Sequence, residues 1–284
     1  MTDTATDETE VDEQQRLIAR ELGVTAAFDV AAEARRRAGF LTDLLVTSGA
    51  RTFVLGISGG VDSAAAGALC RIATRGQALR DAGREARFVA VRLPYGRQQD
   101  EDAAQLVLDT IQADVVLTVD VKAASDAALD SVVAAGLTFA DDAQRDFVLG
   151  NVKARQRMVA QYAIAGAWGG LVIGTDHAAE AVTGFFTKYG DGGVDANPLA
   201  GLTKRRVRAL AAHLGLPESI VQKVPTADLE SLRPGRADED ALGVTYSQID
   251  DFLEGRPVSP EARATIVRHF TSSAHKRVPP LTPA

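Results

Sequence analysis

Cysteine is almost absent from this sequence of 284 residues, which contains only Cys70. A single thiol excludes an intramolecular disulfide and a zinc site built on several thiolates. The acidic first residues also lack the basic and apolar stretches of a secretory signal peptide. Both observations suit a reducing compartment, and we expect a cytoplasmic protein.

An excess of basic residues is lacking as well. The chain has 31 Lys and Arg residues against 38 Asp and Glu residues, and its formal net charge is −7. Six of the carboxylates lie before Arg16, so the rest of the chain is close to neutral. Proteins that bind long nucleic acids by their phosphates carry a basic surplus. We therefore expect no nucleic-acid partner, and a small molecule as any anionic ligand.

Long hydrophobic runs are scarce. Residues 158–175 form an uncharged stretch that just reaches the length of about 18 residues at which a membrane span is considered. Gln161 and four glycines interrupt it, and the pair Gly169-Gly170 favours a break in any helix. We interpret the stretch as the end of a buried helix, a turn and a buried strand over residues 171–174, and we expect no membrane partner.

The composition that remains is that of an ordinary globular protein, with 46% hydrophobic residues, 25 glycines and 10 prolines. Compact apolar or β-branched runs predict four strands, over residues 52–57, 88–93, 115–119 and 171–174. Helical spacing lies between them, over residues 64–74, 98–111 and 141–167. This alternation predicts an α/β fold, a doubly wound and mostly parallel sheet with helices on both faces and ligands at the carboxyl ends of the strands.

The two ends of the chain complete the predicted organisation. The acidic residues 1–14 are typical of a disordered tail, and residues 15–284 are expected to form a single domain. Further helices are predicted over residues 16–22, 30–47 and 203–214. The irregular segments 183–197 and 218–240 are long for loops inside a domain, and both are candidate lids over a substrate.

The most specific local pattern lies where the first predicted strand meets a helix. It consists of Gly56, Ile57, Ser58, Gly59, Gly60, Val61, Asp62 and Ser63. Glycines let the backbone approach an anion closely, while exposed amides at a helix N-terminus and serine hydroxyls favour a phosphate. A carboxylate such as Asp62 fits a phosphate site when it holds a cation, and a phosphate-bound Mg²⁺ is suited to that place.

This loop differs from two common nucleotide-binding patterns. It has no Gly-Lys-Ser/Thr of a Walker loop, and it lacks the glycine spacing of a dinucleotide-binding turn. It resembles the Ser-Gly-Gly-x-Asp-Ser signature of the ATP pyrophosphatase (PP-loop) superfamily. The resemblance implies an adenine nucleotide alpha hydrolase-like fold and cleavage of ATP between its α and β phosphates.

Stretches beyond the loop are similar, in the same order, to the ammonia-dependent NAD synthetases. They are residues 91–96, 174–180, 184–193, 225–230, 242–246 and 275–277. The resemblance covers residues 15–280, with Val61 as one small departure. It implies an NAD synthetase domain over residues 15–284 that works as a homodimer. At the last step of NAD biosynthesis, such an enzyme converts nicotinic acid adenine dinucleotide (deamido-NAD), ATP and ammonia into NAD, AMP and pyrophosphate through an acyl adenylate.

The same resemblance implies roles for individual residues. ATP would lie on residues 56–63, with further contacts from Thr175, Lys204 and Thr226. Mg²⁺ would be held by two hard carboxylates, those of Asp62 and Glu180. Deamido-NAD would be bound by Arg155, Lys188, Asp195, His275 and Lys276. Asp62 and Lys188 are the expected catalytic residues.

Simpler interpretations of some of these residues stay open. A lone basic residue such as Arg155 or Lys276 usually lies on a solvated face. Glu180 follows a strand by a few residues, where a helix start favours a carboxylate. His177 fits a local hydrogen-bond partner at least as well as a catalytic base.

The nitrogen donor and the overall activity also have alternatives. Glutamine use requires an amidase with a catalytic cysteine, whereas Cys70 lies in an apolar helical sequence that suits a buried thiol. Free ammonia is therefore the expected donor, with a separate amidase subunit left open. The other two interpretations are a PP-loop enzyme that adenylates a transfer-RNA base, and a nucleotide-binding module without catalysis.

Overall fold

The computed structural model describes residues 5–96, 101–225, 232, 237–280 and 282, with the backbone alone for residues 5–12. Its centre is a sheet of four strands, β1 (Thr52–Gly56), β2 (Arg87–Arg92), β3 (Val115–Thr118) and β4 (Gly170–Val172). The strand order is β3-β2-β1-β4 and every pair is parallel. The predicted parallel sheet is confirmed, and its topological switch point lies between β1 and β4.

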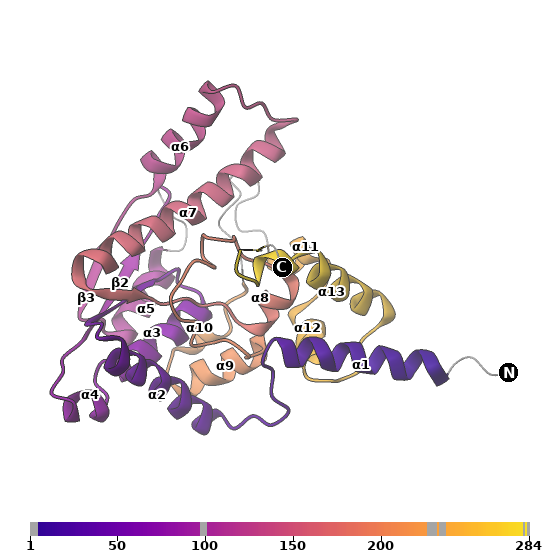
Figure 1. Ribbon diagram of the computed structural model, residues 1–284, viewed down its shortest axis with the longest axis horizontal. Helices are drawn as coiled ribbons and strands as arrows, with labels where there is room; N and C mark the ends of the chain where they lie inside the picture. Colours follow the sequence, from indigo (N-terminus) through magenta and orange to yellow (C-terminus); the bar gives the residue numbers. More distant parts are fainter. Residues whose placement is uncertain (1–4, 97–100, 226–231, 233–236, 281, 283–284) are drawn as a thin grey trace.

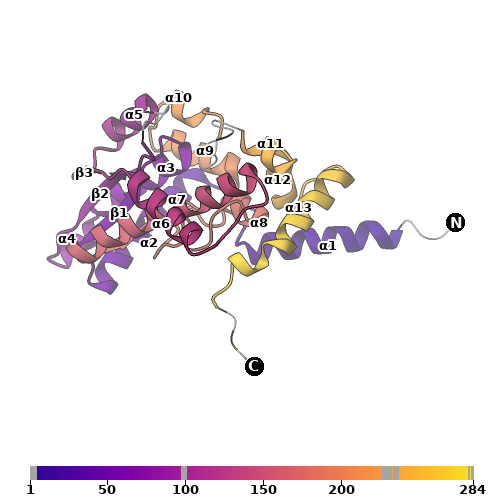
Figure 2. The same cartoon turned by 90° about the horizontal axis from the view of Figure 1, so that it is seen from above.

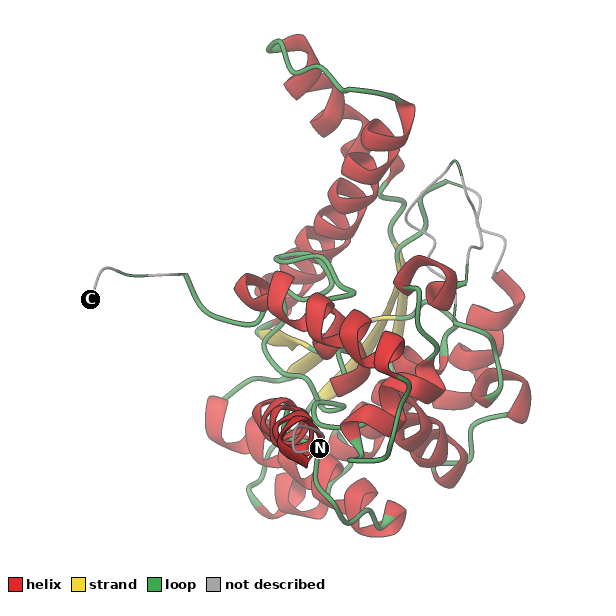
Figure 3. Cartoon of the chain, turned by 90° about the vertical axis from the view of Figure 1, so that its right-hand side faces the viewer, coloured by secondary structure: helices red, strands yellow, loops and turns green. Residues whose placement is uncertain are grey.

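Alternate side chains of the strands enter two separate cores. Phe53 and Leu55 of β1 pack with residues of α2 (Val30–Ser48), α3 (Val61–Ala73) and α9 (Lys204–His213). Val54 faces the other way, toward the core that α7 (Asp142–Trp168) covers with Ala165. Because neighbouring strand residues point to opposite faces, a strand that is buried on both sides needs a continuous apolar run. Figure 3 shows the strands enclosed among helices, as the sequence predicts.

Nine further helical segments complete the described fold. They are α1 (Ala5–Glu21), α4 (Gln77–Asp81), α5 (Glu101–Ile111), α6 (Lys122–Ala134), α8 (Ala178–Thr183), α10 (Glu218–Val221), α11 (Asp238–Leu242), α12 (Tyr246–Leu253) and α13 (Pro260–Ser272), followed by the 3-10 turn η1 (Ala274–Lys276). None of the helices in the described ranges is long and apolar enough to cross a membrane.

α6 and α7 form a helical arm, in which α6 and the beginning of α7 project from the molecule while the end of α7 packs on the sheet (Figure 1). The predicted helix over residues 141–167 corresponds to α7, which begins where the side chain of Asp141 accepts a hydrogen bond from Gln144 N. It ends at Gly169, whose φ of 60° belongs to the left-handed region that favours glycine. α6 is a finding of the structure, because its apolar residues are mostly alanines and mark no clear apolar face.

The N-terminal helix α1 begins earlier than the sequence pattern predicts. Apolar spacing places a helix over residues 16–22, whereas the structure starts α1 at Ala5. Glutamate is a good helix former but adds nothing to an apolar pattern, so the pattern cannot detect the first turns. The assignment of residues 1–14 to a disordered tail stays a prediction.

A second group of helices lies beside the sheet and its covering layers (Figure 2). Ile18 of α1 packs there with Val182 of α8, Phe252 of α12 and Ile266 of α13. This cluster holds α8 in place, and α8 follows β4 by a few residues. The chain thus brings its C-terminal third back to the carboxyl end of β4.

Candidate active site

The glycine loop over residues 56–63 joins the end of β1 to α3 at the switch point of the sheet. Ser63 Oγ accepts a hydrogen bond from Ser58 N at 3.3 Å and lies 3.2 Å from Ser58 Oγ. Gly59 has a φ of 83°, and a Cβ atom there would lie 2.8 Å from the backbone nitrogen of Ala104 on α5. The loop is therefore held by its own serines, and it needs glycine where it passes α5.

The helix that follows the loop begins with free amides at the same switch point of the sheet. Its N-cap is Gly60, which has no side chain to accept a hydrogen bond from the first turn. The first amides of a helix lack partners inside the helix and carry partial positive charge. Loop and helix together offer the backbone groups that the predicted phosphate site would need.

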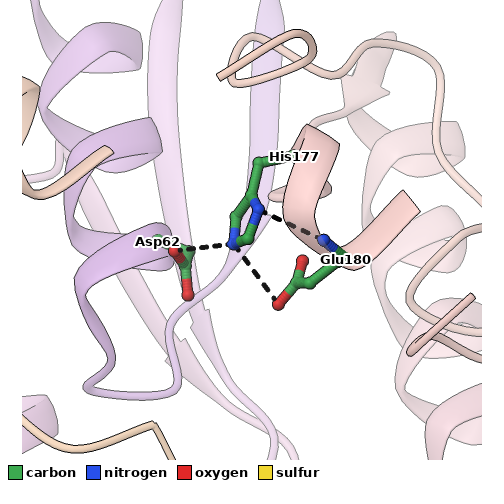
Figure 4. Close-up of side chains that lie close together, drawn as sticks. All are labelled: Asp62, His177 and Glu180. Atoms are coloured by element: carbon green, nitrogen blue, oxygen red, sulfur yellow. Dashed lines mark hydrogen bonds and ion pairs between the residues drawn. The ribbon is translucent and has the colours of Figure 1, made fainter. Parts of the chain in front are cut away.

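Four charged or titratable side chains meet beside this loop, three of them shown in Figure 4. His177 Nε2 lies 3.3 Å from Asp62 Oδ1 and 3.6 Å from Glu180 Oε1. Lys204 Nζ donates to both carboxylate oxygens of Asp62, at 2.9 and 2.7 Å. Asp62 comes from α3, Glu180 from α8 and Lys204 from α9, so three helices that are distant in sequence build one cluster.

His177 serves as the N-cap of α8. Its Nδ1 atom accepts a hydrogen bond from Glu180 N at 3.4 Å. A ring nitrogen that accepts carries no hydrogen, so the neutral imidazole has its hydrogen on Nε2, which faces the two carboxylates. The side chain is 0% exposed. This geometry agrees with the role of a local hydrogen-bond partner.

The cluster shifts the titration of its two carboxylates in opposite directions. Burial alone would raise the pKa of Asp62, but the ammonium of Lys204 and the imidazole of His177 outweigh it and hold that pKa well below its usual range. Burial raises the pKa of Glu180 to about 8, and the negative charge of Asp62 adds to the rise, while His177 and Lys204 oppose it without cancelling it. A cation placed between them would keep both groups ionised.

The cluster suits a divalent cation. One ligand atom each from Asp62, His177 and Glu180 lies within 4.8 Å of the others. The two carboxylates offer the hard oxygen atoms that Mg²⁺ prefers. Lys204 already places a positive charge against Asp62, which shows that this position accepts a cation. Asp62 and Glu180 therefore fit the metal that the sequence predicts.

Two residues of the cluster were not identified from the sequence. The ring of Tyr246 lies 5.0 Å from Lys204 Nζ, and Tyr246 OH donates to Asp238 Oδ2 at 3.0 Å. Both residues are buried. Tyr246 belongs to one of the stretches that resemble NAD synthetases, so its position was the available signal. Its ring and Asp238 help to hold the ammonium of Lys204, which is itself only 1% exposed.

A second group of cations surrounds the segment that follows α8. Lys276 Nζ donates to the carbonyl oxygens of Gly184 and Phe186, at 2.9 and 2.8 Å. Lys188 Nζ donates to the carbonyl oxygen of His275. The structure thus gathers cationic residues that the sequence assigns to deamido-NAD, and it links them to the end of α8 and to η1.

The remaining residues assigned to deamido-NAD lie along α7 and its neighbours. Arg155 Nη2 donates to the carbonyl oxygen of Lys188 at 3.3 Å, so Arg155 joins the second cationic group. Asp195 lies elsewhere, beside β4. Its carboxylate accepts hydrogen bonds from Val172 N at 2.7 Å and from Tyr162 OH at 3.0 Å.

Of the other two residues predicted to contact ATP, the structure describes one. Thr175 is half-buried between β4 and α8, at the same edge of the sheet as the glycine loop. Thr226 lies outside the described residues. The structure adds Lys223, whose Nζ donates to the carbonyl oxygen of Gly59 at 3.4 Å. Nothing in the sequence alone separates this lysine from other surface lysines.

A parallel sheet with an anion loop and a paired carboxylate site at its switch point defines a nucleotide-binding α/β protein. The family model described as NAD synthase matches residues 33–280. The chain therefore belongs to the NAD synthase family.

Named relatives cover nearly the whole chain. The NH(3)-dependent NAD(+) synthetase of Streptomyces coelicolor is 60% identical over 95% of this chain and 97% of the relative. The crystal structure of NAD+ synthetase from Burkholderia pseudomallei has a TM-score of 0.81 at 56% identity, covering 94% of this chain and 97% of that one. The structure of NMN synthetase from Francisella tularensis has a TM-score of 0.77 at 35% identity, covering 90% and 99%.

Proposed function

We propose that this protein is an ATP-dependent ligase that amidates deamido-NAD with ammonia and releases NAD, AMP and pyrophosphate. The observation that carries the proposal is the cluster at the switch point, where the glycine loop meets Asp62, Glu180 and Lys204. Membership of the NAD synthase family supports it, because relatives about 60% identical carry the name of this activity.

The chemistry of the reaction explains why such a site is needed. A carboxylate is a poor electrophile, because its negative charge repels a nucleophile and oxide cannot leave. Attack of the nicotinate carboxylate on the α-phosphorus of ATP forms an acyl phosphate bond and releases pyrophosphate. Ammonia then attacks the acyl carbon, loses a proton and expels AMP. The protein must bring two anions together and align them, which requires positive charge and positioning.

The residues of the chain divide this task. Amides of the glycine loop and of the first turn of α3, with the hydroxyls of Ser58 and Ser63, bind the β and γ phosphates. Lys204 and Lys223 add charge at the loop. Lys188 is proposed as the cation that faces the reacting carboxylate, so that its loss would slow the formation of the adenylate.

Asp62 and Glu180 would hold Mg²⁺. When bound, the ion supplies charge neutralisation for the phosphate oxygens. The side chain of Asp62 is 19% exposed and that of Glu180 is 20% exposed, so both are accessible to an ion from solvent. His177 holds the start of α8, and thereby Glu180, in place.

Free ammonia is proposed as the nitrogen donor. Cys70, the single cysteine, is 0% exposed within the core beneath α3, and burial raises the pKa of its thiol well above the usual range. A buried protonated thiol cannot form the covalent intermediate that a glutamine amidase needs.

We also propose that two copies of the chain pair through the helical arm. Large apolar side chains on α6, α7 and their connection are 40–58% exposed, namely Val132, Val133, Leu137, Phe147 and Val159. Exposed apolar groups gathered on one projecting element are typical of an interface. Because Arg155 lies on the same α7, pairing at the arm would join the interface to the proposed deamido-NAD site.

One assay tests the activity. Purified protein is given deamido-NAD, ATP, Mg²⁺ and ammonium; NAD is measured by a coupled dehydrogenase, and pyrophosphate release is measured in every reaction. Parallel reactions replace ammonium with glutamine, or deamido-NAD with nicotinic acid mononucleotide. The second replacement is included because a relative of similar fold is described as an NMN synthetase. We expect NAD from ammonium and deamido-NAD, with little product in either parallel reaction.

Other results would point elsewhere. Pyrophosphate release without NAD would keep the adenylating half and reject ammonia as donor. Release that depends on transfer RNA would favour a PP-loop enzyme that modifies a base. Binding of ATP without any release would favour a nucleotide-binding module. A preference for the mononucleotide would retain the reaction and change the substrate.

A further inference from the structure

The pairing of β1 with β4 ends before the glycine loop begins. Their paired residues run only as far as Val54 and Val172. Gly174 N then donates to the carbonyl oxygen of Ala196 at 2.8 Å, so the chain after β4 turns away from β1. A gap therefore opens in the sheet beside the last residues of β1, at the switch point itself.

Gly56, the last residue of β1, faces this gap. Neighbouring residues of a strand direct their N–H groups to opposite sides, and Ile57 N donates to Val91 of β2 at 2.9 Å. Gly56 N consequently points to the β4 side, where no strand accepts it. A buried amide needs a partner. Gln161 of α7 supplies one, because Gly56 N donates to Gln161 Oε1 at 2.8 Å.

Features of both residues favour this hydrogen bond between Gly56 and Gln161. A Cβ atom at residue 56 would lie 3.3 Å from Gln161 Oε1, which is tighter than ordinary van der Waals contact, so the close approach favours glycine there. The other end of the amide is also engaged, since Gln161 Nε2 donates to the carbonyl oxygen of Arg157 at 3.4 Å. These two bonds orient the Gln161 amide with its oxygen toward β1.

Helix α7 reaches the neighbouring strands in the same way. Arg157 Nε donates to the carbonyl oxygen of Leu93, directly after β2, at 3.0 Å. Tyr162 OH donates to Asp195, whose carboxylate accepts from Val172 N of β4. Polar side chains of one helix thus contact the ends of β1 and β2 directly and reach β4 through Asp195, and Gln161 is the one that contacts the strand leading into the glycine loop.

We propose that Gln161 is a positioning residue for the ATP loop: its side-chain oxygen takes the place of a strand partner for Gly56 and fixes the backbone from which the loop departs. This inference rests on the proposed use of ATP. Without the acceptor, the Gly56 amide loses its partner, the end of β1 moves, and the loop amides no longer converge on the phosphates.

The test compares Gln161→Met, which keeps the length and removes the amide, with Gln161→Glu, which keeps an acceptor. Gln77→Leu is the matched control, because Gln77 is an exposed glutamine of α4 that donates to Asp81. ATP affinity is measured by calorimetry without deamido-NAD. Hydrogen exchange of a peptide that covers residues 53–60 is measured in parallel, together with the melting temperature.

We expect Gln161→Met to weaken ATP binding by about tenfold and to speed exchange of this peptide. Gln161→Glu should restore slow exchange, and Gln77→Leu should match the wild type in both measurements. Wild-type ATP affinity and exchange in Gln161→Met would overturn the proposal, as would a lower melting temperature with unchanged affinity. Wild-type protein that binds ATP but forms no NAD would contradict the proposed function alone, because the binding comparison would still stand.

Discussion

The pairing of Lys204 with Asp62 is the most consequential contact at the scale of single residues. Lys204 was expected as an ATP contact, and the structure places its ammonium on the carboxylate expected to hold the metal. The two roles are compatible, because an ammonium that neutralises Asp62 in the free protein stands next to the place where phosphates would bind. A lysine at this position can change partners without moving its backbone.

Replacing Asp62 tests the metal assignment. Asp62→Asn should reduce pyrophosphate release by about 10²–10³-fold, because the charge that would hold the cation is gone. Stability should fall by about 1–3 kcal/mol, since Lys204 keeps only an amide oxygen as partner. Asp81→Asn, at an exposed acceptor on α4, is the control and should leave both unchanged. Pyrophosphate release at the wild-type rate would contradict the assignment.

A buried carboxyl next to this cluster gives a pH dependence. Burial, followed by repulsion from Asp191, raises the pKa of Asp176 to about 7, and Asp176 Oδ1 has no hydrogen-bond partner. Because the folded pKa lies above the ordinary value, the protonated form stabilises the fold, and this stabilisation is lost as the pH rises from about 4 to about 7.

Asp176→Asn should therefore escape the loss of stability that the wild type shows as the pH rises. Relative to the wild type, its melting temperature should rise as the pH increases from 4 to 7 and level off at higher pH, since the amide cannot ionise. Thermal denaturation across this pH range measures the difference. An offset between the two proteins that stays constant with pH would show that Asp176 titrates normally.

The candidate site was predictable from the sequence as far as chemistry marks its residues. Asp62 lies in a short pattern that suits a phosphate and a metal ion, whereas Lys204 and Glu180 are expected only from the resemblance to NAD synthetases. Gln161 and Tyr246 act through contacts with a strand end and a lysine that are far away in sequence, so no local pattern reveals them. Residues that position others are visible only once the fold brings them together.

At the scale of elements, the strands were easier to predict than the helices around them. Each of the four strands lies in a compact apolar run, and β1 and β2 are buried on both faces, which demands such a run. α6 is alanine-rich and mostly exposed, and the first turns of α1 are mostly polar in sequence, so no periodic apolar face marks them. What the sequence could not predict is which helix reaches which strand end, since that depends on how the layers pack.

The contact between the glycine loop and α5 can be tested with two glycines. Gly59→Ala should destabilise the fold by about 1–3 kcal/mol and weaken ATP binding, because its Cβ would lie 2.8 Å from Ala104 N and its φ is 83°. Gly83→Ala also has a positive φ, of 63°, but an open surrounding. Gly83→Ala should lower the free energy of unfolding by only about 1 kcal/mol, the cost of a positive φ for alanine, and ATP binding should be unchanged. Equal ATP affinities in the two variants would argue against close packing of the loop.

For the whole molecule, the arm and the sheet form one connected unit. α7 contributes apolar side chains to the core under β1 and β4, exposed apolar groups to the proposed interface, and polar contacts to the strand ends. A change in the pairing of two copies would therefore act on α7, the helix that contacts the strand end before the glycine loop.

Phe147→Asp tests the proposed pairing. Phe147 on α7 is 58% exposed, and a carboxylate there should break an apolar interface between two copies. Sedimentation should show a dimer for the wild type and a monomer for the variant. Leu17→Asp, at a 52% exposed position of α1, is the control and should remain dimeric. A wild-type monomer, or a variant that still pairs, would show that the arm is not the interface.

The ion pair between Asp62 and Lys204 has a further consequence for folding. A cluster of unpaired acidic groups would repel one another during folding, and the chain would then depend on dissolved cations to reach its native state. Lys204 removes much of that dependence, because the chain carries a counter-ion for Asp62 on a neighbouring helix. We therefore expect the chain to fold first and to bind its charged ligands afterwards, at a site where the charge of Asp62 is already balanced by Lys204.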